Sequence, residues 1–149
     1  LNHLLDEDDL AAALGSLARN LADRGLLLFD LNTLLAYRTT FALDSVVERD
    51  GLVFAWRGES SSDAAPGCLA SARVDVFAAR EGCWERHAVA FEQRHFPPHL
   101  VTALMAAAGL ECLGVCGVLA DGSPVPEVDE TTQLKALYVA RLAKGGDPE

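Results

Sequence analysis

The sequence has few basic residues and no long apolar run. Its 149 residues include 12 Lys and Arg against 22 Asp and Glu, which gives a formal net charge of -10 at pH 7. Duplex nucleic acid is bound by basic surfaces, so this charge argues against nucleic acid and favours a small neutral or cationic partner. The chain has no stretch of about 18 apolar residues and no signal-peptide pattern. We therefore expect a cytoplasmic protein without a membrane partner.

The chain also shows no pattern of a metal site. Its four cysteines and four histidines are scattered, and they do not form the ligand set of a structural zinc site. Cys112 and Cys116 fall in one predicted strand, four residues apart, so both side chains should lie on the same face without meeting. We predict no metal site and reduced, partly buried thiols.

The strongest pattern is an apolar run at residues 25–32 that is uncharged up to its end, where it carries a carboxylate, Asp30, and an amide, Asn32. The run shows no alternation of apolar and polar residues and is too short for a core helix. It therefore predicts a strand buried on both faces in the interior of a parallel sheet. Ligands of open α/β sheets bind beyond the carboxyl ends of the strands, so Asp30 and Asn32 are candidate ligand-binding residues. Asp30 can equally cap the following loop.

Helical patterns flank this strand. An acidic cluster opens a predicted helix at residues 9–24, because carboxylates favour the positive end of the helix dipole. Its apolar stripe consists of four leucines at helical spacing: Leu10, Leu14, Leu17 and Leu21. A Pro-Pro pair and a second apolar stripe predict another helix at residues 97–109.

Strand patterns fill most of the remaining chain. Asp50-Gly51 between two β-rich runs predicts a hairpin, and residues 72–78 and 83–96 predict long antiparallel strands with one solvated face. Two more strands are expected at 110–119 and 134–142. The tail at residues 143–149 is expected to be disordered.

The order of these elements resembles the C-terminal half of a class I methyltransferase that uses S-adenosylmethionine. The matching motifs cover nearly the whole chain, at residues 1–4, 8–10, 17–21, 25–32, 94–97, 104–111 and 135–141. The resemblance implies an α/β fold with a partial Rossmann-like methyltransferase sheet of strands five to seven. The last strand would be antiparallel and inserted between its two predecessors. Residues 1–142 would form the C-terminal part of the domain, with an antiparallel β insert at 45–96 as a lid or floor for the acceptor.

Two parts of the family pattern are missing. The sequence has neither the Gly-rich loop nor the acidic residue that holds the cofactor ribose, and no Gly-x-Gly pattern precedes a helix. We therefore expect the C-terminal portion of a longer or split methyltransferase, with an incomplete site for S-adenosylmethionine. The strand at residues 26–31 would then have an unpaired apolar edge. Such an edge predicts a homo-oligomer or pairing with the missing N-terminal half.

The resemblance places Leu1, Asn2 and His3 at the end of the missing fourth strand, where the family binds the methionine part of the cofactor. Histidine is the residue type whose ordinary pKa lies near neutrality, so His3 is the candidate catalytic residue, as a base that deprotonates the acceptor. The alternative is a histidine at the helix entry bonded to a nearby carboxylate.

Five side chains are expected to bind the acceptor: Asp30, Asn32, Tyr37, Arg38 and His95. Arg38 could hold a carboxylate through two hydrogen bonds, or it could be a solvated surface residue. Trp56 and Trp84 either line the acceptor pocket or pack within the antiparallel strands.

The predicted function is methyl transfer from S-adenosylmethionine to a small-molecule acceptor. Two alternatives stay open. One is a non-catalytic binding or assembly module derived from a methyltransferase half-domain, and the other is a protein of unrelated α+β fold. An upstream Gly-rich strand-turn-helix would favour the enzyme over the assembly module.

Overall fold

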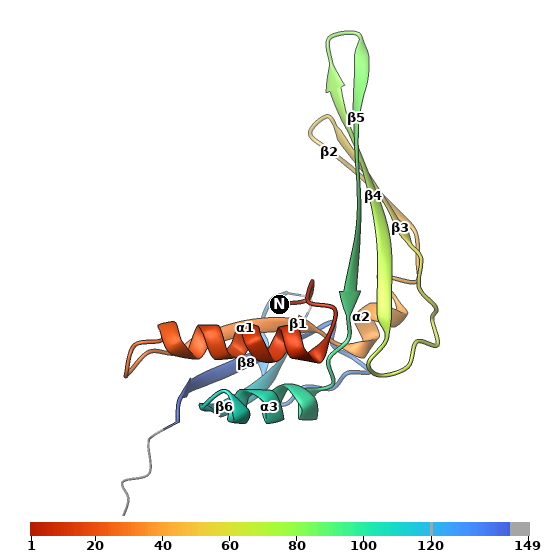
Figure 1. Cartoon of the computed structure of the whole chain (residues 1–149). Coiled ribbons are helices and arrows are strands. Elements are labelled where there is room, and N and C mark those ends of the chain that lie inside the picture. The colour runs from red at the N-terminus through yellow and green to blue at the C-terminus, as the bar shows by residue number, and fades with distance from the viewer. Residues whose placement is uncertain (120, 144–149) are drawn as a thin grey trace, which may run out of the picture.

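The chain forms two sheets, which we call the body sheet and the arm sheet (Figure 1). The structure, a computed structural model, describes residues 1–119 and 121–143. The tail predicted at residues 143–149 lies outside the described residues, except for Ala143. No helix in the described part of the chain is long and apolar enough to cross a membrane.

The body sheet has the strand order β1-β8-β6-β7. The bounds of its strands are Leu27–Asn32 for β1, Leu110–Val118 for β6, Pro124–Val125 for β7 and Lys135–Leu142 for β8. β8 lies between β1 and β6 and is antiparallel to both, so β1 and β6 are parallel to each other. This order agrees with the insertion of the last strand that the resemblance implies. Among the described strands β1 pairs with β8 alone, so its outer edge is unpaired, as the sequence analysis expects for this chain.

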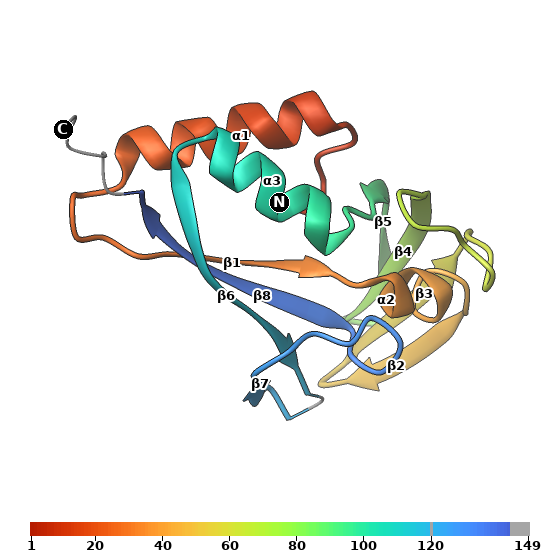
Figure 2. The ribbon, with the colours of Figure 1, turned by 90° about the horizontal axis from the view of Figure 1, so that it is seen from below.

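One face of the body sheet packs against α1 (Glu7–Asn20) and α3 (Pro98–Ala107), as Figure 2 shows. α1 begins where the Asp6 carboxylate accepts a hydrogen bond from the Asp9 amide, at 2.7 Å, as a capping residue does. Leu10 and Leu14 from the predicted stripe are fully buried, and each contributes about 1.5–3 kcal/mol to folding. The main core combines these helices with side chains from the sheet, namely Leu31, Leu110, Ala136, Tyr138 and Ala140.

The opposite face of the body sheet is open. Leu28 on β1 is 57% exposed, and Leu113 on β6 is 44% exposed. Both helices lie on the other side (Figure 2). The prediction that residues 25–32 are buried on both faces is therefore wrong, since no described element covers this second face.

A β-bulge changes the alternation of side chains along β6. Cys112 pairs with Ala140 of β8, and Gly114 pairs with the adjacent residue, Val139. Leu113 therefore has no paired residue on β8. Cys112 packs on the helix-covered core, whereas Cys116 pairs with Leu137 on the open face. The prediction that the two cysteines share a face is wrong, because the extra residue reverses the alternation. All four cysteines are free thiols.

The arm sheet is an antiparallel meander that projects away from the body (Figure 1). Its strands have the bounds Ser45–Arg49 for β2, Leu52–Gly58 for β3, Leu69–Arg80 for β4 and Cys83–Arg94 for β5. The Asp50-Gly51 turn has positive φ angles of 53° and 76°, which confirms the predicted hairpin. The antiparallel strands expected at 45–96 are confirmed, and their role as a lid or floor stays a prediction.

A second, smaller core lies where the arm meets the body. The short helix α2 (Leu34–Arg38) brings Tyr37, and the chain after it brings Phe41, against Ala70 and Ala72 of β4. The Trp56 indole donates a hydrogen bond to the Thr40 carbonyl at 2.6 Å and makes edge contacts with two neighbouring rings. Trp56 therefore packs at this junction, whereas Trp84 on β5 is 55% exposed.

Candidate functional site

Three of the predicted site residues meet at the carboxyl end of β1. The Asn2 Oδ1 accepts a hydrogen bond from the Asn32 backbone N–H at 2.7 Å. The Asn32 side-chain amide donates to Gln93 Oε1 at 2.8 Å, and Gln93 Nε2 lies 3.4 Å from His3 Nε2. A chain of polar contacts thus joins the N-terminal segment, the end of β1 and the base of β5.

Gln93 and Phe91 belong to this site, although the sequence analysis did not select them. Gln93 is buried, and Phe91 packs edge-on against the His3 ring with centroids 5.5 Å apart. Strand alternation places Val89, Phe91 and Gln93 on one face of β5. A polar side chain in line with two apolar ones was the signal that could have identified Gln93.

The contact with Gln93 turns one ring nitrogen of His3 toward an amide. An amide nitrogen only donates, so His3 Nε2 faces Gln93 Nε2 as the acceptor. The distance of 3.4 Å is longer than an ordinary hydrogen bond. The contact can therefore orient the ring and still give way to a ligand.

An open groove of about 520 Å³ lies beside His3. This volume falls in the range of small-molecule sites, about 300–1,000 Å³. Its walls come from the N-terminal segment and from β4 and β5: His3, Leu5, Glu59, Ser71, Arg73, Ala90, Phe91 and Glu92. A neighbouring cavity of about 400 Å³ shares Glu59, Ser71 and Glu92. The side chains that line the shared part are carboxylates and a hydroxyl.

Asp30 and Leu1 occupy different surroundings. The Asp30 carboxylate forms an ion pair with Lys135 of β8, and both side chains are half-exposed. Leu1 packs against the main core. The roles of Asp30 in acceptor binding and of Leu1 in cofactor binding stay predictions.

Tyr37 and His95 are buried, so their predicted position beside an open crevice is wrong. His95 is 0% exposed; its Nδ1 accepts a hydrogen bond from the Gly67 amide at 3.0 Å, and its Nε2 donates to Glu130 at 2.8 Å. The Tyr37 hydroxyl donates to the Arg94 carbonyl at 2.8 Å. These contacts hold loops of the chain together and leave neither ring nitrogen of His95 for a ligand.

Arg38 is half-buried, and its Nε donates to the Ala64 carbonyl at 2.8 Å. This bond ties α2 to the loop between β3 and β4. A bidentate contact between Arg38 and an acceptor carboxylate stays a prediction.

Burial and these contacts shift the pKa values of Glu130 and Tyr37. Burial acts to raise the pKa of Glu130, but hydrogen bonds from His95 and the Leu34 amide hold the pKa below its ordinary value. Burial raises the pKa of the Tyr37 hydroxyl, and the nearby Cys68 adds to this effect. Residues 1–119 and 121–143 contain no group of three His, Cys, Asp or Glu side chains that could hold a metal ion.

No protein-family model and no curated protein matches this chain. Its fold is similar to solved methyltransferase structures. An S-adenosylmethionine-dependent methyltransferase from Clostridium acetobutylicum matches with a TM-score of 0.78 and 18% identity, over 96% of this chain and 55% of the other. The CcbJ methyltransferase from Streptomyces caelestis matches with a TM-score of 0.62 and 17% identity, over 96% and 53% of the two chains.

A third similar structure is CalS10 from Micromonospora echinaspora, an amino pentose methyltransferase solved with bound S-adenosylmethionine. It matches with a TM-score of 0.52 and 17% identity, over 93% of this chain and 52% of the other. The chain thus spans about half the length of the methyltransferases it matches. At these identities the likeness shows a shared fold.

Proposed function

We propose that the chain is the C-terminal portion of an S-adenosylmethionine-dependent methyltransferase that acts on a small-molecule acceptor. The observation that carries the proposal is the match of 96% of the chain to 55% of the Clostridium acetobutylicum methyltransferase, at a TM-score of 0.78. The strand order β1-β8-β6 supports it. These strands would be numbers five, seven and six of the family's sheet.

The open surfaces of the body sheet also support this proposal. The outer edge of β1 and the face that carries Leu28 and Leu113 have no described cover. Exposed apolar sheet surfaces of this kind are usually covered by another element. The N-terminal half of the domain would pair with β1, cover the open face and supply the Gly-rich cofactor loop.

The residues present fit one edge of the cofactor. Asn2 and His3 offer polar atoms at the end of β1, next to an open groove. A Gly-rich loop for the rest of the cofactor has to come from the other half, since the sequence has none. When bound, S-adenosylmethionine supplies an electrophilic methyl group on its sulfonium.

The groove beside His3 favours an acceptor that carries an amine. Glu59, Glu92 and Arg73 line it, and Arg73 pairs with Glu59, so Glu92 leaves the lining with one net negative charge that attracts a protonated amine. The amino pentose acceptor named for the Micromonospora echinaspora enzyme is a compound of this kind. Asn32 and Arg38 would hold its other polar groups.

His3 would act as the base. An ammonium group must lose a proton before its nitrogen lone pair can form the new bond to carbon, and His3 Nε2 would take that proton in place of the contact from Gln93. Positioning of the acceptor and exclusion of water would supply most of the remaining catalysis.

Calorimetric titration with S-adenosylhomocysteine tests the proposal as a whole. We expect binding at micromolar strength by the polypeptide that joins this chain to its upstream sequence, and no measurable binding by the 149-residue chain alone. Micromolar binding by the short chain would show that the cofactor site is complete without a Gly-rich loop. Failure of the longer polypeptide to bind would overturn the methyltransferase assignment and favour the assembly module.

Replacement of His3 by glutamine tests the role of the base. In the longer polypeptide we expect His3→Gln to lower kcat by about 10²–10⁴-fold near neutral pH. The loss should shrink at alkaline pH, where the amine acceptor loses its proton unaided. His87→Gln is the matched control, because His87 is an exposed arm residue that contacts Glu85. An unchanged kcat in His3→Gln would remove His3 from the mechanism.

A further inference from the structure

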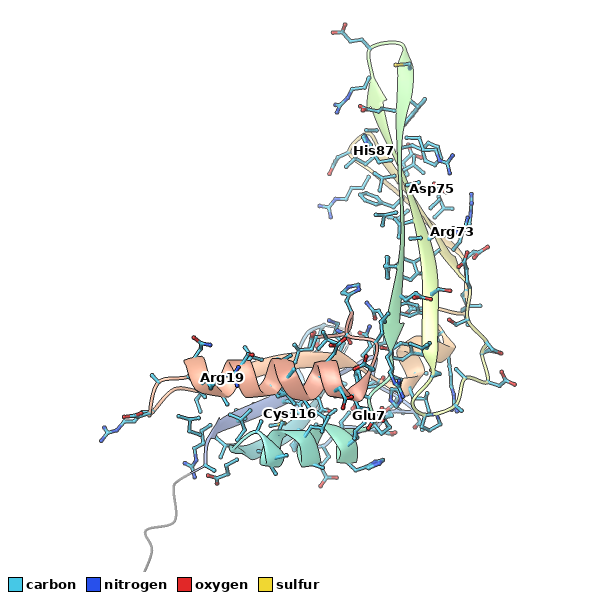
Figure 3. The ribbon with its side chains drawn as sticks, viewed as in Figure 1. Glu7, Arg19, Arg73, Asp75, His87 and Cys116 are labelled. Carbon is cyan, nitrogen blue, oxygen red and sulfur yellow. The ribbon has the colours of Figure 1, made fainter. Side chains whose placement is uncertain are left out.

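One face of the arm sheet carries arginines around a buried carboxylate, next to the groove of His3, with which their cavity shares Arg73 and Ala90. Asp75 lies in the middle of β4 and is only 3% exposed. Arg86 of β5 donates from Nε and Nη2 to Asp75 Oδ1 at 2.9 and 2.7 Å. Arg57 of β3 places its Nη2 3.4 Å from the other oxygen, Oδ2. Figure 3 shows Asp75 and Arg73 along β4 in the projecting arm.

The strand register explains why these side chains converge. Asp75 pairs with Ala55 on one side and Ala88 on the other, and both neighbours are small. Strand alternation places Arg57 and Arg86 on the same face as Asp75. The long arginine side chains can therefore fold over the short alanines and cover the carboxylate, which accounts for its burial.

More positive than negative side chains line the cavity in this cluster. Arg73 adds a third guanidinium on the same face and pairs with Glu59 at 2.9 Å. The cavity has a volume of about 230 Å³, and its charged lining consists of Arg57, Arg73, Arg86 and one carboxylate, Asp75. The carboxylates of Glu59 and Glu92 lie outside this lining, in the neighbouring groove.

We propose that this cavity binds a phosphate group, either as a free ion or as part of a phosphorylated small molecule. Each guanidinium has five N–H donors in a planar fork that matches phosphate oxygens. Asp75 engages only one nitrogen of Arg57 and two of Arg86. The remaining donors are free of Asp75, and the carboxylate holds both planes in place, so the ligand does not have to order them.

Phosphate binding can be tested without the methyltransferase cofactor. The experiment is calorimetric titration of the purified protein with inorganic phosphate, and separately with methyl phosphate, at constant ionic strength. We expect saturable binding with one site per chain. Tighter binding of methyl phosphate assigns the site to a phosphorylated small molecule, and tighter binding of inorganic phosphate assigns it to the free ion.

Three substitutions locate the binding. Arg57→Gln leaves the Arg86–Asp75 pair intact and should weaken phosphate binding by about tenfold without loss of the fold. Arg86→Gln should weaken phosphate binding at least as much, but it also removes the two hydrogen bonds that the buried Asp75 carboxylate accepts from Arg86. Arg80→Gln is the control, since Arg80 is an exposed arginine of β4 that pairs with Glu85.

Two results would overturn the proposal. One is the absence of saturable phosphate binding by the unsubstituted protein. The other is an equal weakening by Arg80→Gln and Arg57→Gln, which would mean that phosphate responds only to overall charge. Because the readout involves neither S-adenosylmethionine nor methyl transfer, its failure would leave the proposed function standing.

Discussion

The two tyrosines of the chain, Tyr37 and Tyr138, are both buried. Burial raises the pKa of both hydroxyls above the ordinary value. In the unfolded chain both hydroxyls lose their protons at about pH 10, the ordinary pKa of tyrosine. The folded state keeps them, so the stability that they support is present below that pH and is lost as the pH rises above it.

We predict that tyrosinate absorbance appears only as the protein unfolds in an alkaline titration. Absorbance and far-ultraviolet circular dichroism, recorded on one sample, should change together. Tyr138→Phe should halve the absorbance step. A step that precedes the loss of circular dichroism would show that at least one hydroxyl reaches solvent in the folded state.

Glu130 gives a prediction at acid pH. Its pKa is lowered in the folded state, so the stability it provides is present above its unfolded pKa, about 4.3, and is lost as the pH falls through the folded value. Glu130→Gln keeps an acceptor for His95 but removes the charge. We expect it to lower the free energy of unfolding at neutral pH by about 1 kcal/mol and to flatten the decline in acid.

Urea unfolding at a series of pH values measures this effect. Glu127→Gln is the control, because Glu127 lies in the same connection but is exposed. Equal changes in the two variants would show that the contact between buried His95 and half-buried Glu130 contributes nothing specific.

At this scale the sequence selected candidate residues but did not predict which of them contact one another or which are buried. Asn2 and His3 were selected from the resemblance, and Asn32 from its place at the end of an apolar strand; the structure brings the three together. His95 was placed wrongly. Its partners, Gly67 and Glu130, come from two distant loops, and no local pattern encodes such contacts.

Among the elements, β3 makes an unusually close contact at the base of the arm. A Cβ added at Gly58 would lie 2.5 Å from the Phe41 carbonyl carbon and closer still to its oxygen. Both atoms belong to the backbone and cannot rotate away. Glycine at this position therefore allows β3 to approach the chain that follows α2.

We predict that Gly58→Ala destabilises the protein by about 1–3 kcal/mol, the usual cost of overpacking. Gly15→Ala in α1 is the matched control, because the nearest atom to its added Cβ is the Arg19 side chain at 3.5 Å. That change should stabilise the helix by about 0.5–1 kcal/mol. Thermal unfolding measures the stability of both variants. An equal change in the free energy of unfolding would mean that the arm can shift at its base and relieve the contact at Gly58.

The elements also show the limit of periodic patterns. The Asp50-Gly51 hairpin was predicted because its turn requires residues that tolerate positive φ. The bulge in β6 was not, because Leu113 is an apolar residue in an apolar run and fits either register. The burial of β1 on both faces failed for a similar reason, since an apolar run predicts burial but does not name what covers it.

For the whole molecule, the open face and the free edge of β1 predict self-association of the isolated chain. We expect sedimentation velocity to show a dimer or larger species. Leu28→Lys should shift the population toward monomer, because it places charge on an apolar surface that is 57% exposed. Leu43→Lys is the control, at a leucine that is 62% exposed outside the body sheet. A monodisperse monomer of the unsubstituted chain would contradict this prediction.

The central place of β8 also has a consequence for synthesis on the ribosome. β1 and β6 both pair with β8, and the ion pair between Asp30 and Lys135 joins residues 105 positions apart. The strands of the arm are sequence neighbours, so the arm can fold while translation continues, but the body sheet has to wait for its last strand. A ribosome that stalls before Lys135 would hold β1 and β6 without their shared partner, and we expect such nascent chains to need a chaperone.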